Sequence, residues 1–144
     1  KQLPLSKLDL SKVGAGETEA LFNRPEWKSL SESCLGCGTC TFVCPTCQCF
    51  NISDEGNTLE GRRLRSWDNC MSPLFTREAS GHNPRTAKAL RMRNRVSHKY
   101  WYAPDYSDGR FACTGCGRCI KQCPVSLDIR EIVLNAIADD AEAK

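Results

Sequence analysis

Eight of the eleven cysteines fall into two runs with the same spacing, C-x2-C-x2-C-x3-C, each followed directly by proline. The first run is Cys34, Cys37, Cys40 and Cys44 with Pro45, and the second is Cys113, Cys116, Cys119 and Cys123 with Pro124. Thiolates at this spacing ligate [4Fe–4S] clusters, and where two runs occur together the fourth cysteine ligates the other cluster. The repeat predicts two such clusters, single-electron transfer and no open iron site for a substrate.

The fourth cysteine of each run is expected to leave its own loop, because the proline that follows it fixes a turn. We therefore expect one cluster to be bound by Cys34, Cys37, Cys40 and Cys123, and the other by Cys113, Cys116, Cys119 and Cys44. Two alternatives stay open, namely one cubane beside a [3Fe–4S] cluster, or structural zinc. Zinc usually takes two C-x2-C pairs separated by a spacer, so it fits a doubled run of this kind poorly.

Three cysteines lie outside the two runs: Cys47, Cys49 and Cys70. One interpretation is that they pack as small buried hydrophobic residues. The other is a third metal site, in which Cys47 and Cys49 form a C-x-C pair and either His82 or Asp68 supplies a further ligand.

Length and composition limit the class of protein. A chain of 144 residues corresponds to about one domain. No apolar run approaches the roughly 20 residues that span a bilayer, so no membrane span is expected. Cysteines at three-residue steps are too close to pair with one another, and thiolate clusters need a reducing compartment, which predicts a cytoplasmic protein. Residues 1–24 are expected to be an arm or linker from a missing upstream region, and residues 25–144 to form the dicluster domain.

Helix and turn signals surround the two runs. Pro25 suits the first turn of a short helix that leads into the first run. Turn-forming residues at 53–57 separate two strand-like stretches and predict a β-hairpin over about 48–67. After the second run, Asp128 with Glu131 predicts a capped final helix. Its expected buried face is Ile129, Ile132, Val133, Ala136 and Ile137.

A helix rich in basic residues is predicted after the hairpin. Asn83 is the expected N-cap and Pro84 the first helical residue, and the helix should reach about Lys99 and end before Pro104. Its apolar stripe is Ala89, Met92, Val96 and Tyr100, and its basic residues are Arg85, Lys88, Arg91, Arg93, Arg95 and Lys99. The charges predict a solvated face, a docking surface for an acidic redox partner, or charge balance for the clusters. No nucleic-acid-binding signature accompanies them.

Several stretches between and around the cysteines carry a family resemblance. They are CLGCGTCTFVCPTCQCF at 34–50, WDNC at 67–70, ASGHNP at 79–84, and the segment 113–129. Over about residues 27–135 the chain resembles the dicluster iron–sulfur subunits of multi-subunit hydrogenases and reductases. The beta subunits of cytoplasmic sulfhydrogenases and the A subunits of anaerobic sulfite reductases are similar to it.

The resemblance implies a mostly α fold, an α-helical ferredoxin-like dicluster domain with a small β-hairpin insertion between the two cluster motifs. It implies a relay of electrons between a flavin subunit that uses NAD(P)H and a catalytic subunit that holds [NiFe] or siroheme. It implies no flavin or nucleotide on this chain. The family pattern also includes residues that match Cys47, Cys49, Cys70 and His82, which favours a third iron–sulfur cluster.

These features bear on three candidate functions. A non-catalytic electron-relay subunit of an oxidoreductase complex agrees with all of them. A catalytic subunit of the heterodisulfide reductase type should carry a tandem CCG signature, which is absent from the sequence. An iron–sulfur redox sensor usually brings a DNA-binding or signalling domain, and none is visible. The sequence therefore favours the relay.

Overall fold

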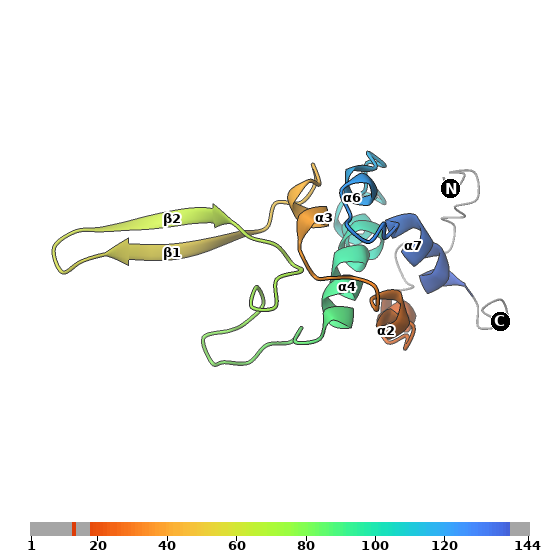
Figure 1. The fold of residues 1–144 in the computed structure, drawn as a ribbon, viewed down its shortest axis with the longest axis horizontal. Helices are drawn as coiled ribbons and strands as arrows, with labels where there is room; N and C mark the ends of the chain where they lie inside the picture. The colour runs from red at the N-terminus through yellow and green to blue at the C-terminus, as the bar shows by residue number, and fades with distance from the viewer. Residues whose placement is uncertain (1–12, 14–17, 139–144) are drawn as a thin grey trace.

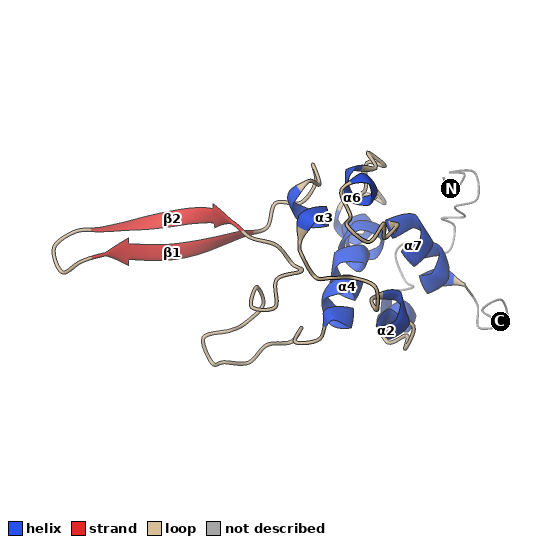
Figure 2. Ribbon diagram, in the orientation of Figure 1, coloured by secondary structure: helices blue, strands red, loops and turns tan. Residues whose placement is uncertain are grey.

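The helix α4, Lys88–Ser97, lies at the centre of a mostly helical body from which one long β-hairpin projects (Figures 1 and 2). The computed structural model describes Val13 and residues 18–138. Along the chain the elements are α1 (Thr18–Phe22), α2 (Trp27–Leu30), α3 (Thr39–Phe42), β1 (Phe50–Gly56), β2 (Gly61–Trp67), α4, the π-helical turn η2 (His98–Tyr102), α5 (Ala103–Tyr106), α6 (Arg118–Lys121) and α7 (Ile129–Ile137). Helices α1, α2 and α7 all contact α4.

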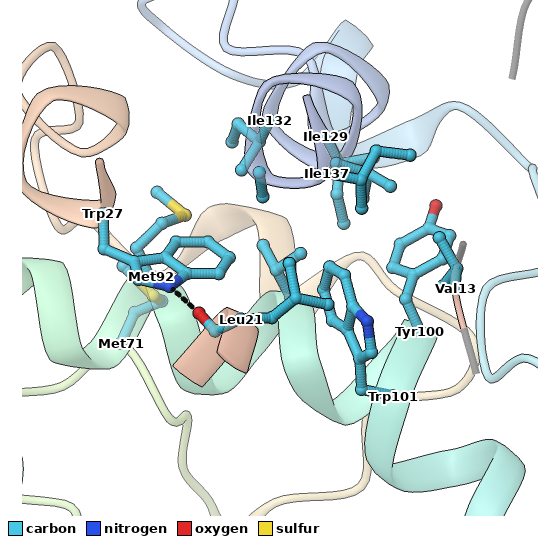
Figure 3. Packing of buried hydrophobic residues seen from close by; sticks show 13 residues of the cluster. Val13, Leu21, Trp27, Met71, Met92, Tyr100, Trp101, Ile129, Ile132 and Ile137 are labelled. Carbon is cyan, nitrogen blue, oxygen red and sulfur yellow. Dashed lines mark hydrogen bonds between the residues drawn. The ribbon is translucent and has the colours of Figure 1, made fainter. Parts of the chain in front are cut away.

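The hydrophobic core lies where α7 and the two N-terminal helices pack on α4 and η2 (Figure 3). Trp27 donates a 2.8 Å hydrogen bond from Nε1 to the carbonyl oxygen of Leu21. Its ring meets that of Trp101 edge to face, with centroids 6.4 Å apart. Val96 of α4 and Val133 of α7 belong to the same core and are completely buried. Burial of side chains of this size stabilises the fold by about 1.5–3 kcal/mol each.

The final helix agrees with its prediction at the buried face. Ile129, Ile132, Val133, Ala136 and Ile137 are all buried, as their spacing predicts. Asp128 is the N-cap, and its Oδ1 accepts a 2.9 Å hydrogen bond from the backbone N–H of Arg130. No hydrogen bond among the described residues joins Glu131 to the backbone N–H of Asp128, and the Arg130 guanidinium instead pairs with the Asp128 carboxylate at 2.6 Å. At the other end, Arg24 donates to the carbonyl oxygens of Ala136 and Ala138.

A β-hairpin lies between the two cysteine runs, but its turn comes later than predicted. The strands pair antiparallel from Phe50 opposite Trp67 to Gly56 opposite Gly61, so residues 53–56 belong to β1. Bidentate pairing of Arg63 with Asp54 keeps this polar stretch in the strand. The turn is residues 57–60, where Oδ1 of Asn57 accepts from two backbone N–H groups. Such Asx turns are local alternatives to a strand ladder.

The basic helix begins later and extends further than predicted. Asn83 does not cap it, because Oδ1 accepts from Thr76 and from the backbone N–H of Arg85 while Nδ2 donates to the carbonyl of Pro73. The helix begins at Lys88 and continues through η2 into α5, past Pro104. Pro104 lies in the first turn of α5, where a missing N–H is tolerated, so the expected stop before it is wrong.

Part of the expected N-terminal arm lies against the body. Val13 and Leu21 are buried members of the hydrophobic core. Residues 1–12, 14–17 and 139–144 lie outside the described residues. Among the helices that the structure describes, none is long and apolar enough to cross a membrane.

Candidate iron–sulfur sites

The two cysteine runs have the same local structure. Each run begins on a loop, its third cysteine lies on a one-turn helix, α3 in the first and α6 in the second, and its fourth lies two residues past that helix. The two helices contact each other. The helices are preceded by Gly38 and Gly117, whose φ angles of 77° and 71° are left-handed. A Cβ at Gly38 would lie 2.7 Å from the side chain of Asn69. Glycine at these two positions lets the loop wind tightly enough to direct several thiols to one side.

Cysteines from both runs line one cavity. Its wall includes the four residues of the first predicted set, which are Cys34, Cys37, Cys40 and Cys123. Met71, Met92 and Arg95 close the wall on the side of the protein interior. Soft thiolate donors from two segments that converge on an apolar cavity fit an iron–sulfur cluster. The structure thus brings Cys123 to the first run, although Cys123 lies 83 residues after Cys40 in the sequence.

Backbone amides donate to the sulfur atoms of this cavity. The N–H of Gly36 lies 3.3 Å from Sγ of Cys34, and the N–H of Leu127 lies 3.3 Å from Sγ of Cys123. Hydrogen bonds to ligand sulfur stabilise added negative charge and raise the reduction potential of a cluster. The backbone around the cavity therefore favours a bound group that accepts an electron.

The second predicted set is held together by contacts around Cys44. Thr46 Oγ1 lies 3.2 Å from Sγ of Cys44 and donates a 2.6 Å hydrogen bond to the carbonyl oxygen of Ala112, next to Cys113. Hydrogen bonds with Cys47 and with Thr46, together with the Lys99 ammonium, lower the pKa of Cys44 despite its partial burial.

The other cysteines of the second set follow Ala112, to which Thr46 is bonded. Cys119 lies near both Cys113 and Cys44, and Cys116 is exposed. Burial and then a hydrogen bond with Cys113 raise the pKa of Tyr100, so its hydroxyl stays protonated and donates to that sulfur.

The three spare cysteines lie next to the predicted ligands, without His82. Cys47 hydrogen-bonds Cys44, and Cys70 lies near Cys49 and Cys40. Burial raises the pKa of Cys70 to about 12. His82 is exposed, and no hydrogen bond of the described residues joins its imidazole to these thiols. The third site stays a prediction.

None of the described residues form a group of three or more His, Cys, Asp or Glu side chains suited to one metal ion. This finding concerns single ions such as zinc, whose ligands all lie about 2.0–2.3 Å from one centre. The ligands of a cubane bind four different irons and therefore lie further apart.

The basic helix turns several of its charges inward. Arg91, Arg95 and Lys99 expose only 8%, 4% and 5% of their surface, so the expected solvated basic face is wrong for these three residues. They are equally unable to dock an acidic partner, because docking needs accessible charge. The charge of Arg95 interacts with Cys40, Cys119, Cys70 and Cys47, and that of Lys99 with Cys47 and Cys44.

The sequence does not predict several residues of the site, or shows them only as members of the basic helix. Thr46 and Met71 carried no signal. Arg95 and Lys99 did, because they are four residues apart and next to the apolar stripe of Met92 and Val96 in helical phase. A basic residue next to a buried stripe can extend into the interior when a negatively charged group lies there.

Comparisons with known proteins agree with this arrangement. The family model described as 4Fe-4S dicluster domain matches residues 33–127, which include all eleven cysteines. Sulfhydrogenase 2 subunit beta of Pyrococcus furiosus is 37% identical over 130 residues, which cover 89% of this chain and 38% of that protein. The chain thus spans less than half the length of this curated relative. No solved structure matches it. With the cysteines of two runs meeting at one cavity inside the matched region, the chain belongs to the family of 4Fe-4S dicluster domains.

Proposed function

We propose that this chain is an electron-relay subunit of a multi-subunit oxidoreductase. Two [4Fe–4S] clusters would be bound, one by Cys34, Cys37, Cys40 and Cys123 and the other by Cys113, Cys116, Cys119 and Cys44. The observation that carries the proposal is the cavity that cysteines of both runs line together. When bound, the clusters accept and release single electrons, and a cluster with four thiolate ligands offers no free iron to a substrate.

The residues around the clusters have three tasks in this proposal. The thiols of both runs hold the irons, and the crossed sets keep the two clusters close together. The amides of Gly36 and Leu127 donate to ligand sulfur. Met71 and Met92 keep water away from the inner side of the first cavity, since both are 1% exposed. Exclusion of water and hydrogen bonds to sulfur are the means by which a protein sets a cluster's potential.

Partner subunits would cover the outer side of the clusters. Leu35 and Phe42 lie within the first run, yet they expose 66% and 54% of their surface. Trp67, at the base of the hairpin, exposes 70%. Apolar side chains near a redox centre suit a surface that another subunit covers. The relative's name is that of a sulfhydrogenase subunit, which supports a place in a multi-subunit complex. The partners we propose are a flavin subunit that uses NAD(P)H and a catalytic subunit that holds [NiFe] or siroheme.

The direct test is to count iron and acid-labile sulfide in protein purified without oxygen. Two cubanes predict about eight irons and eight sulfides per chain, together with a reversible one-electron EPR signal on reduction. A third cluster at Cys47, Cys49 and Cys70 would raise the iron count above eight. Stoichiometric zinc without sulfide would refute the relay.

A further inference from the structure

Arg95 is a buried cation that faces the predicted ligands of both clusters. Its side chain lines the cavity of the first set together with Cys40, the thiol with which its charge interacts most strongly. It also hydrogen-bonds Cys119, which belongs to the second set. Only 4% of Arg95 is exposed, and its Nε has no hydrogen-bond partner. The guanidinium therefore lies between the two cysteine runs and out of contact with water.

A second buried arginine on the same helix shows what an ordinary structural role looks like. Arg91 donates from Nη1 to the carbonyl oxygens of Arg85 and Thr86, at 3.1 and 2.6 Å. Backbone oxygens thus accept from Nη1 and hold the segment before α4, although the Nε of Arg91, like that of Arg95, has no hydrogen-bond partner. No hydrogen bond or salt bridge of the described residues gives Arg95 an oxygen acceptor, and the sulfur of Cys119 takes that place.

A buried guanidinium needs negative charge close by. Removing a charged group from water costs several kcal/mol unless a counter-charge repays it. The thiols around Arg95 supply such charge only as thiolates, and ligated thiolates with their irons are net negative. Reduction adds a further negative charge, which a cation within a few ångströms stabilises in a medium of low dielectric constant.

We propose that Arg95 is a positioning residue shared by both clusters, which holds Cys40 and Cys119 on either side of one guanidinium and makes both clusters easier to reduce. The inference rests on the proposed function. Each reduction takes one electron from an external donor, which is oxidised, and no bond forms or breaks. A charge common to both sites favours an added electron on either of them, which suits passage between the two.

Lys99 provides the contrast within the same helix. Its Nζ donates a 2.9 Å hydrogen bond to Thr46 and also bonds Cys44 and Cys47, all on one short segment. Only Cys44 among these belongs to a predicted cluster set, the second. Lys99 should therefore influence the second cluster, whereas Arg95 should influence both.

The test is an anaerobic redox titration followed by EPR on the complete chain loaded with clusters. We expect Arg95→Met, which keeps bulk and removes charge, to make each cluster at least about tenfold harder to reduce, a shift of about 59 mV for one electron. Arg95→Lys keeps the charge, so its cluster potentials should lie close to those of the unmodified protein. Lys99→Met should lower the potential of one cluster. Arg93→Met is the control, because Arg93 lies on the same helix with its guanidinium over the ring of Phe22.

Iron content separates this inference from the proposed function. If the unmodified protein holds no iron, the relay fails before any variant is measured. If it is loaded but Arg95→Met leaves either potential where it was, the shared role is refuted. If Arg95→Met cannot be loaded, Arg95→Lys decides. Near-normal potentials in Arg95→Lys support the role of the charge, and loss of clusters there too refutes it.

Discussion

Thr46 donates a hydrogen bond from Oγ1 to the carbonyl oxygen of Ala112 over 2.6 Å, which joins the end of the first cysteine run to the start of the second. Lys99 completes a closed set of bonds at this point. Its Nζ donates to Thr46 Oγ1 at 2.9 Å, and its carbonyl oxygen accepts from the N–H of Ala112 at 2.9 Å. Three distant segments thus meet beside Cys44 through protein contacts alone, so the protein itself holds Cys44 next to the second run.

Loss of the Thr46 hydroxyl should loosen this junction. We expect Thr46→Val to lower the free energy of unfolding by about 1 kcal/mol, which is typical for loss of one such hydrogen bond. Denaturant unfolding of the iron-loaded protein under anaerobic conditions measures it. Thr86→Val is the matched control, because Thr86 is exposed and only its carbonyl is used. Equal midpoints for the two variants would contradict the role of Thr46.

The crossed ligand sets can be tested by two cysteine variants. Cys44→Ser should alter the EPR signal of the cluster bound by Cys113, Cys116 and Cys119. Cys123→Ser should alter the signal of the other cluster, because Cys123 lines the cavity of the first run. Cys40→Ser identifies the signal of that first cluster. If Cys44→Ser changes the same signal as Cys40→Ser, each run binds its own cluster and the crossed sets are wrong.

The N-cap of α7 should stabilise the protein over a wide range of pH. Burial alone would raise the pKa of Asp128, but the hydrogen bonds from Arg130 outweigh it and lower the pKa. A carboxyl with a lowered pKa in the folded state stabilises fully above its unfolded pKa of about 3.9, and the effect is lost only as the pH falls through the lowered value.

Asp128→Ala should therefore cost about 1 kcal/mol, and the cost should be the same at pH 8 and pH 5. Thermal unfolding midpoints of the iron-loaded protein at the two pH values test this. Asp128→Asn is the control, since it keeps a capping oxygen and loses the charge. A cost that is smaller at pH 5 than at pH 8 would show that the pKa of Asp128 is raised.

The hairpin should be dispensable for the clusters. Both strands are exposed along nearly their whole length, with one half-buried residue in each. Replacement of residues 53–64 by Asn-Gly would close the strands after the pair Ile52 and Arg65 with a favoured two-residue turn. We expect unchanged iron content and a stability within about 0.5 kcal/mol of the full-length chain. Loss of iron would mean that the hairpin supports the site.

The features that depend on the spacing of residue types could be predicted from the sequence. The two cysteine runs, the hairpin between them and the buried face of α7 depend on spacing, which the chain displays directly. The turn at 57–60 was misplaced because ion pairs such as that of Asp54 with Arg63 hold a polar stretch in a strand. The helix end at Pro104 was misplaced because a π-helical turn precedes it. Both errors come from contacts between residues, which local propensity does not contain.

The larger difference between prediction and structure concerns which basic side chains of the helix point into the interior. Arg95 and Arg93 are two positions apart and chemically identical, yet one lies among thiols and the other lies 3.4 Å from the ring of Phe22. The local sequence does not distinguish the two arginines, because both are basic residues of the same predicted helix. What separates them is their position around the helix relative to the cysteine runs, which depends on the assembled fold.

The π-helical turn η2 has a consequence for how this protein can vary. It places Lys99, Tyr100 and Trp101 in the interior as three consecutive residues, each at most 5% exposed. Deletion of one residue there would return the turn to α-helical pitch and rotate everything that follows relative to Cys113. Homologous chains should therefore differ in η2 by substitution only, whereas changes of length should accumulate at residues 57–60, where the chain meets solvent on every side.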